Sequence, residues 1–254
     1  MKTVVISRAA VHTGSLILVN PAHPVRNIPL REELQPPFDS APQILLQRRA
    51  AVMLRCLTAD IGAEKKILPV SGYRTGREQQ KLYAETMVEK GEDFTRKFVA
   101  IPGCSEHETG LAVDLAEKGP EIDFIRPSFP DTGLCGTFRR RAAAYGFIQR
   151  YQPGKEVVTK IAPEPWHFRY VGVPHGMVME SRGFSLEEYV DFLRDFSPER
   201  PLSIRPENGR EAKIYFLAFG KDETMEMSLS EKNPYLISGN NIDGVVITIW
   251  NANQ

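Results

Sequence analysis

The sequence predicts an α+β fold, and two observations support that prediction. Apolar residues recur at helical spacing in several segments, and these segments alternate with short apolar runs of strand length. After Phe196 the pattern changes to β-type runs alone. The 254 residues suffice for one sizeable core, or for a core with a small appendage. The 42% apolar and 25% charged residues are typical of a globular protein.

The first elements alternate between strands and helices. Residues 14–20 ("GSLILVN") predict a strand, because two prolines in the following "NPAHP" prevent its continuation. After a proline-rich passage, apolar residues at helical spacing predict a helix from about 43 to 63. Residues 39–40 are its candidate caps and Gly62 is its stop. Within 66–75, a short apolar strand that runs into a loop is expected.

The following segments continue the same alternation of helices and apolar runs. They predict a helix at 76–90, a compact apolar segment at 110–116 and a helix that starts at 137 and ends near Gly146. A strand at 166–172 follows, and then a helix at 185–196 that opens with the capping box Ser185 and Glu188.

A change in composition marks a domain boundary near residue 198. The stretch "SPERPLSIRPENG" is rich in proline and is typical of a linker. Three β-type runs follow it, at 212–220, 224–230 and 243–250. We therefore predict a core domain over residues 1–198 and a small antiparallel β subdomain over residues 199–254. Because three short strands seldom hold together alone, the subdomain is expected to pack on the core.

Charge and hydropathy exclude several classes of protein. Lys plus Arg number 32 and Asp plus Glu number 32, so nothing favours nucleic acid or an anionic membrane as the main partner. No segment approaches the roughly 18 consecutive apolar residues that span a bilayer, and the first residues lack the apolar stretch of a signal peptide. The three cysteines have no metal-type spacing. They are expected to be reduced thiols in a cytoplasmic protein.

Two short motifs contain the candidate metal ligands. In "SEHETGLAVDLAE", Asp114 follows His107 by seven positions, which would place them on opposite faces of one continuous strand. The chain must therefore turn between them, and Gly110 permits that turn. In "EPWHFRY", His167 follows Glu164 by three positions. Two imidazoles and one carboxylate are ligands that a catalytic zinc takes, with water in the fourth position. A neighbouring carboxylate could then act as general base toward that water.

The alternative is that these are unrelated polar residues of turns and strands. His107 would then lie in a surface turn, and His167 would lie on the polar face of an edge strand. Asp114 weighs against this alternative, because a carboxylate inside the apolar "LAVDLA" needs a partner if it is buried. From spacing alone, the two interpretations are about equally supported.

Three motifs, "SGYRT", "SEHETGLAVD" and "EPWHFRY", occur in this order and resemble those of the zinc D,D-peptidases, the family of the VanY carboxypeptidases and VanX dipeptidases. The shared pattern is Ser-x-His, six residues, Asp, and later Glu-x-x-His. The resemblance covers about residues 14–196. With "LILVNPAHP", "YGFIQRY" and "WHFRYVGVPH" included, the chain most resembles the bifunctional VanXY-type members.

The resemblance implies a catalytic core with a central antiparallel sheet flanked by helices, in addition to the small C-terminal β region. It also implies one Zn²⁺ per chain, with His107, Asp114 and His167 as ligands and Glu164 as the catalytic base.

Three further residues match substrate-facing positions of the family. The resemblance places Arg74 beside the scissile carbonyl, where its fixed fork of donors suits an oxygen that gains negative charge. It gives Gln79 and Ser105 roles in substrate binding, with the Ser105 hydroxyl holding the terminal carboxylate. The alternatives are a surface salt bridge for Arg74 and an exposed helix position for Gln79.

The implied activity is zinc-dependent hydrolysis of the D-Ala-D-Ala dipeptide and of the C-terminal D-Ala of peptidoglycan pentapeptide precursors, as in vancomycin resistance. These peptides are the expected partners, without nucleic acid and without membrane insertion. Two alternatives stay open: an L,D-carboxypeptidase acting on tetrapeptide precursors, and a non-catalytic zinc- or peptidoglycan-binding domain. The presence of Glu164 and Arg74 argues against the second, because a binding module needs neither.

Overall fold

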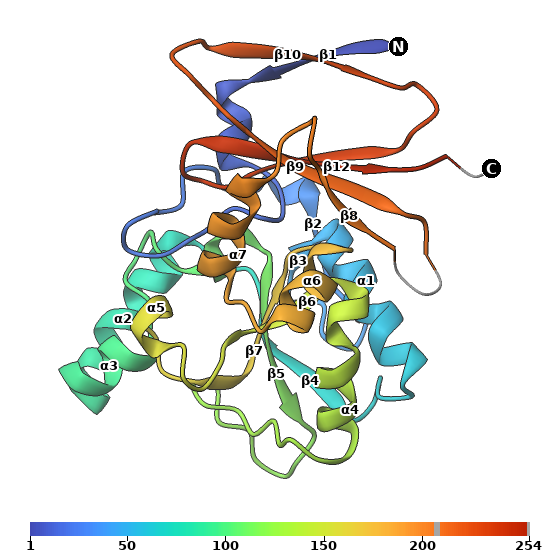
Figure 1. Ribbon diagram of the computed structural model, residues 1–254. Helices are drawn as coiled ribbons and strands as arrows, with labels where there is room; N and C mark the ends of the chain where they lie inside the picture. Colours follow the sequence, from blue (N-terminus) through green and yellow to red (C-terminus); the bar gives the residue numbers. More distant parts are fainter. Residues whose placement is uncertain (206–208, 253–254) are drawn as a thin grey trace. The chain divides into compact units, whose positions relative to one another are not determined.

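The computed structural model describes residues 1–205 and 209–252, and the chain forms two compact units. One unit is continuous and comprises Val19–Ser185. The other combines Met1–Leu18 with Leu186–Gln254, so both ends of the sequence contribute to it. In Figure 1, blue and red segments accordingly belong to the same unit.

The continuous unit is built on a four-stranded antiparallel sheet in the order β4-β5-β7-β6 (Figure 1). Its strands are β4 (Ile67–Ser71), β5 (Ala112–Glu117), β6 (Phe147–Tyr151) and β7 (Glu164–Tyr170). The two central strands are buried almost throughout, which explains why β5 is mostly apolar rather than alternating. The polar residues of β7 are buried as well, so they need partners inside the protein. The predicted fold class, α+β with a central antiparallel sheet and helices, is confirmed.

Helices and two short strands complete this unit. They are α1 (Arg48–Asp60), α2 (Gly76–Lys90), α3 (Glu92–Phe98), α4 (Gly133–Ala142), α5 (Glu156–Thr159) and α6 (His175–Arg182), with β2 (Leu34–Gln35) paired to β3 (Leu46–Gln47). Three 3-10 helices lie between them, η2 (Arg31–Glu33), η3 (Glu106–Thr109) and η4 (Ala143–Tyr145).

The helix predicted at 76–90 has the predicted bounds. A capping box begins it, in which the Glu78 amide donates to the Thr75 hydroxyl at 3.2 Å and the Thr75 amide donates to the Glu78 carboxylate at 2.8 Å. Gly91 ends it with a φ of 83°, a conformation that favours glycine.

The helix predicted at about 43–63 begins later than expected. α1 starts at Arg48, and Gln47 rather than residues 39–40 takes the cap position. The reason is that Gln47 belongs to β3 and its amide donates to the carbonyl of Gly110 at 2.8 Å. Gly62 follows the end of the helix in the left-handed conformation, as predicted.

The predicted strand at 14–20 is wrong. This segment forms turns and irregular backbone, although its apolar residues are buried. The Leu16 amide donates to the Ser238 hydroxyl at 2.8 Å, and the Leu18 amide donates to the Asn240 carbonyl at 3.1 Å. Its backbone donors are therefore satisfied by a loop and a side chain, so burial does not require a ladder.

The described residues of the discontinuous unit form two antiparallel sheets. One has the order β11-β12-β9-β8, and the other pairs β1 with β10. Their strands are β1 (Lys2–Ser7), β8 (Leu202–Ile204), β9 (Ala212–Ala218), β10 (Thr224–Leu229), β11 (Tyr235–Gly239) and β12 (Gly244–Trp250). In the part of this unit that the structure describes, the strands are accompanied by the short helices η1 (Arg8–His12), α7 (Leu186–Phe192) and η5 (Leu193–Asp195).

The three β-type runs predicted after Phe196 all form strands, but they do not form one sheet. β10 pairs instead with β1, in a register that sets Lys2 opposite Leu229 and Ser7 opposite Thr224. Side chains from both chain ends share one core, with Ile6 buried beside Tyr215, Val245 and Ile247. Packing of the C-terminal strands on the core domain stays a prediction.

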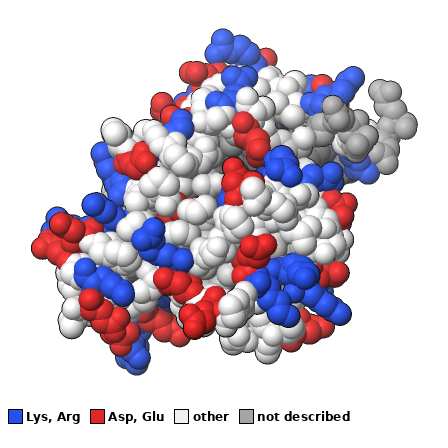
Figure 2. All heavy atoms as spheres, turned by 90° about the horizontal axis from the view of Figure 1, so that it is seen from below, with Lys and Arg blue, Asp and Glu red and all other residues white. Residues whose placement is uncertain are grey.

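The distribution of charged side chains on the surface agrees with the equal numbers of acidic and basic residues in the sequence. Figure 2 shows acidic and basic side chains interspersed over one face of the molecule, and the sequence holds 32 of each sign. No helix within the described residues is both long and apolar enough to cross a membrane.

Candidate active site

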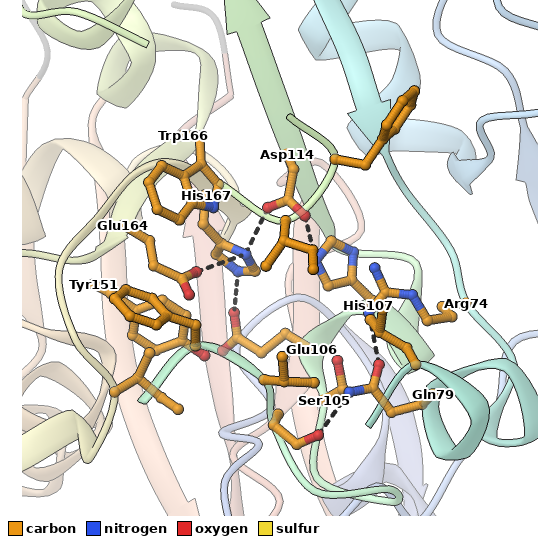
Figure 3. Close-up of a pocket in the computed structure, with 17 residues that line it drawn as sticks. Arg74, Gln79, Ser105, Glu106, His107, Asp114, Tyr151, Glu164, Trp166 and His167 are labelled. Atoms are coloured by element: carbon orange, nitrogen blue, oxygen red, sulfur yellow. Dashed lines mark hydrogen bonds and ion pairs between the residues drawn. The ribbon is translucent and has the colours of Figure 1, made fainter. Parts of the chain in front are cut away.

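All of the residues singled out from the sequence line a single pocket of about 540 Å³ in the continuous unit (Figure 3). They are Arg74, Gln79, Ser105, His107, Asp114, Glu164 and His167.

The candidate metal ligands come from η3 and the two central strands. β5 and β7 pair so that Asp114 lies directly opposite His167. His107 lies on η3, and Gly110 ends this short helix with a φ of 68°, which provides the predicted turn into β5. The sheet register therefore fixes two of the ligands relative to each other, and the glycine turn brings in the third.

The three side chains approach closely enough to share one ion. One ligand atom from each lies within 4.8 Å of the others, and all three residues are buried. His107 Nε2 is 3.1 Å from Asp114 Oδ2, and His167 Nδ1 is 3.0 Å from Asp114 Oδ1. Zinc bonds of about 2.0–2.2 Å in tetrahedral geometry place ligand atoms roughly 3.3–3.5 Å apart. Two imidazoles and a carboxylate at these distances fit a zinc ion with one open position.

A backbone carbonyl orients His107. Its Nδ1 lies 2.7 Å from the carbonyl oxygen of Gly72, which leaves Nε2 facing Asp114. A Cβ at Gly72 would lie only 2.5 Å from the carbonyl oxygen of Leu45, so glycine allows this close passage of the chain. The close passage of the chain at Leu45 thus explains why "SGYR" has a glycine at position 72.

Electrostatics keep Asp114 ionised. Burial alone would raise the pKa of Asp114, but His107 and His167 lower it well below its usual range. Burial lowers the pKa of His107, whereas the neighbouring carboxylates of Asp114 and Glu106 overcome the effect of burial on His167 and raise its pKa to about 10. The cluster therefore combines a permanent carboxylate with two imidazoles, which is a cation-binding arrangement.

Glu164 lies beside this cluster, at the start of β7. Its Oε2 is 3.6 Å from His167 Nδ1, and its side chain is buried. Burial raises the pKa of Glu164 to about 8. A carboxylate that exchanges a proton near neutral pH has the property that a general base needs.

Arg74 is held in a fixed orientation at the edge of the pocket. Its Nη1 donates to Gln79 Oε1 at 2.7 Å, and its Nη2 donates to Ser71 Oγ at 2.8 Å. Gln79 is 1% exposed, and its Nε2 donates to the carbonyl of Ala100 at 2.6 Å. The alternative of an exposed helix position for Gln79 is therefore wrong. Ser105 also lines the pocket and is buried.

A buried ion cluster next to the ligands was not anticipated from the sequence. Glu106 Oε1 accepts from Arg150 Nε at 2.8 Å and from Arg169 Nη1 at 2.7 Å, and all three residues are buried. Burial would raise the pKa of Glu106, but Arg169 and Arg150 lower it below its usual range. Charged residues within the otherwise apolar "FIQRY" and "WHFRY" were the available signal.

Comparisons with known proteins agree with this geometry. The family model described as "VanY: D-alanyl-D-alanine carboxypeptidase" matches residues 43–173. The chain is 41% identical over 174 residues to the bifunctional D-Ala-D-Ala dipeptidase and carboxypeptidase VanXYC of Enterococcus gallinarum, a match that covers 66% of this chain and 92% of that one.

Two solved structures extend the comparison. The vancomycin resistance D,D-dipeptidase VanXYg, in complex with a D-Ala-D-Ala phosphinate analog, matches with a TM-score of 0.95 and 44% identity, over 98% of this chain and 99% of that one. A vancomycin resistance D,D-pentapeptidase VanY mutant in complex with Zn(II) matches with a TM-score of 0.54 and 32% identity, over 69% of this chain and 98% of that one. The related enzymes thus include zinc enzymes, and the sequence, the pocket and these matches together establish that the chain belongs to the VanY family of D-alanyl-D-alanine carboxypeptidases.

Proposed function

We propose that the chain is a zinc-dependent D,D-peptidase with two substrates. It hydrolyses the D-Ala-D-Ala dipeptide, and it removes the C-terminal D-Ala of peptidoglycan pentapeptide precursors. The observation that carries the proposal is the buried set of His107, Asp114 and His167, with Glu164 beside it in the same pocket. Hydrolysis of these termini would remove the target of vancomycin.

In this proposal one zinc ion per chain is held by His107, Asp114 and His167. A zinc ion bound there would lower the pKa of a water molecule and polarise the scissile carbonyl. The fit of the donor distances to a tetrahedral site supports the assignment.

Glu164 is proposed to move the proton. It would accept a proton from the attacking water and then deliver it to the leaving nitrogen of D-Ala. Two observations support this role. Glu164 Oε2 lies 3.6 Å from His167 Nδ1, and burial makes the side chain a better proton acceptor than an exposed carboxylate.

Arg74 is proposed to stabilise the negative charge that develops on the carbonyl oxygen. Its guanidinium is preorganised by Gln79 and Ser71, so no reorientation is needed as charge appears. Ser105 and Gln79 are proposed to bind the substrate, with the Ser105 hydroxyl at its terminal carboxylate. The Gln79 amide already bonds to Arg74 and to the Ala100 carbonyl, which supports a contribution through Arg74.

The alternatives are less well supported. The relatives that are 41% and 44% identical to the chain act on D-Ala-D-Ala or are D,D-dipeptidases, whereas an LD-carboxypeptidase matches at 32% identity, so an L,D-carboxypeptidase acting on tetrapeptides is not favoured. A non-catalytic binding domain would need neither the buried Glu164 nor the oriented Arg74.

We also propose a cytoplasmic location. The thiols of Cys56, Cys104 and Cys135 are free, which fits a reducing compartment. Cytoplasmic precursors would then be the substrates available to the enzyme.

Release of D-Ala by the purified zinc-loaded protein tests the proposal. D-Ala-D-Ala, D-Ala-D-Ser and a muramyl pentapeptide are the substrates. Wild-type protein should act on D-Ala-D-Ala and on the pentapeptide, and Glu164→Gln should keep zinc and lose about 10²–10⁴-fold in turnover. Glu64→Gln, at an exposed position, is the matched control and should behave like wild type. A Glu164→Gln enzyme within a few-fold of wild type would place the base elsewhere.

A further inference from the structure

Glu106 lies between two candidate site residues in the sequence, Ser105 and His107, and lines the same pocket. One oxygen, Oε1, accepts from both Arg150 and Arg169 at 2.8 and 2.7 Å. The other oxygen, Oε2, is fully buried and has no hydrogen-bond partner among the described residues 1–205 and 209–252. A buried carboxylate oxygen without a donor is costly, so its position calls for a function.

One ring nitrogen of His167 is likewise buried without a hydrogen-bond partner among the described residues. Within the described part of the chain, its Nε2 also has no hydrogen-bond partner, and this nitrogen lies 3.6 Å from Glu106 Oε2. Figure 3 shows the imidazole of His167 between two carboxylates, with Asp114 on one side and Glu106 on the other. The two unsatisfied atoms therefore face each other, and a shift of about half an ångström would join them in a hydrogen bond.

The ring nitrogen of His167 that faces Asp114 determines which of the two nitrogens carries the proton of the neutral imidazole. Nδ1 points to Asp114 Oδ1 at 3.0 Å, inside the group of ligand atoms. A neutral imidazole carries one proton, so a metal at Nδ1 requires that proton on Nε2. Among the described residues, Glu106 Oε2 is the acceptor positioned to receive it.

Arg150 and Arg169 explain why the Glu106 carboxylate can accept hydrogen bonds but cannot donate one. Arg150 lies on β6 and Arg169 on β7, and their guanidinium groups hold the carboxylate in its charged form from two neighbouring strands. An ionised carboxylate has no proton to donate. His107, by contrast, faces the neutral carbonyl of Gly72, so the two histidines have acceptors of different charge.

We propose that Glu106 is a positioning residue of the zinc site, which accepts the Nε2 proton of His167 and so fixes its tautomer and ring orientation with Nδ1 free for the metal. The inference rests on the proposed zinc site. Carboxylate–histidine–metal arrangements raise the basicity of the ligand, and their loss costs about 10–100-fold in metal affinity.

The competing explanation is that Glu106 only neutralises Arg150 and Arg169. In that case its loss would lower stability, but it would leave the tautomer of His167 and the intrinsic zinc affinity unchanged. Zinc affinity and tautomer therefore distinguish a positioning role from a structural one.

The first measurement is the zinc dissociation constant, by competition with a chelator. Glu106→Gln keeps the shape of the side chain and removes its charge, and we expect the dissociation constant to rise about 10–100-fold. Glu108→Gln is the matched control, because Glu108 is a buried carboxylate of the same short helix whose Oε1 accepts from the Gly103 amide at 2.8 Å. Glu108→Gln should bind zinc as wild type does. Equal affinity in Glu106→Gln and wild type would overturn the proposal.

The second measurement needs no variant, and it keeps the proposal testable if Glu106→Gln does not fold. Long-range ¹⁵N–¹H spectra of zinc-loaded, ¹⁵N-histidine-labelled wild-type protein report the tautomer of each ring. We expect a proton on Nε2 of His167 and on Nδ1 of His107. A proton on Nδ1 of His167 would overturn the positioning role while leaving zinc binding intact. Wild-type protein that binds no zinc would overturn the proposed site as well, so the two failures are distinguishable.

Discussion

Arg74→Lys tests whether a fixed guanidinium, rather than positive charge alone, is needed in the pocket. Arg74 uses Nη1 to bond Gln79 at 2.7 Å and Nη2 to bond Ser71 at 2.8 Å. A lysine ammonium is a single point of charge on a flexible stem, so it cannot keep both contacts and also point to the substrate. The substitution thus retains the charge and removes the preorganisation.

The expected loss follows from the role of a preorganised donor. Removal of one oxyanion donor costs about 10²–10³-fold in kcat, or about 2.7–4 kcal/mol. We expect Arg74→Lys to lower kcat by this amount with little change in KM, because the contact strengthens in the transition state. Gln79→Leu leaves Arg74 in place and removes one of its two anchors. Its kcat should fall by a smaller factor.

Steady-state release of D-Ala from D-Ala-D-Ala provides both constants. Arg77→Lys is the matched control, because Arg77 is exposed on the first turn of α2, three residues after Arg74, and the substitution is identical. It should change neither constant. A rise in KM for Arg74→Lys at unchanged kcat would refute the reasoning, since that result would make Arg74 a residue of ground-state binding.

Three further outcomes are expected. His167→Ala should lose the zinc that elemental analysis finds in wild-type protein, and equal zinc in both would contradict the ligand assignment. Burial lowers the pKa of His175 to about 3, so the free energy of unfolding should fall as pH drops from about 6.5 toward 3, by about 3 kcal/mol at pH 4.5. Urea unfolding of His175→Gln should show a weaker pH dependence, and an identical dependence would exclude His175 as its source. Truncation to residues 1–200 should lower the melting temperature, because β1 loses its partner β10, and a truncated chain that melts like the full chain would refute packing of the C-terminal strands on the core.

The candidate ligands that the sequence singled out come together in the structure because each motif includes its own local geometry. His107, Gly110 and Asp114 lie within one short stretch, where a glycine turn decides how the two ligands meet. Glu164 and His167 are likewise neighbours on one strand. Local sequence therefore contained most of the information needed for these positions.

The features that the sequence did not reveal depend on contacts between distant segments. The apolar run at 14–20 was buried without a strand partner, and periodicity cannot distinguish these cases. β1 was missed because its partner, β10, lies near the other end of the chain. The role of Glu106 emerges only when Arg150 and Arg169 are brought to it by two different strands.

The pairing of β1 with β10 has a consequence for synthesis on the ribosome. Lys2 is synthesised long before its partner Leu229, because most of the sequence lies between them. At about 5–20 residues per second, the first strand waits roughly 10–45 s for its neighbour. The continuous stretch Val19–Ser185 holds every pocket residue and emerges complete during that interval. Nascent chains should therefore acquire their catalytic half first, while "KTVVIS" stays an unpaired edge that cellular chaperones can bind.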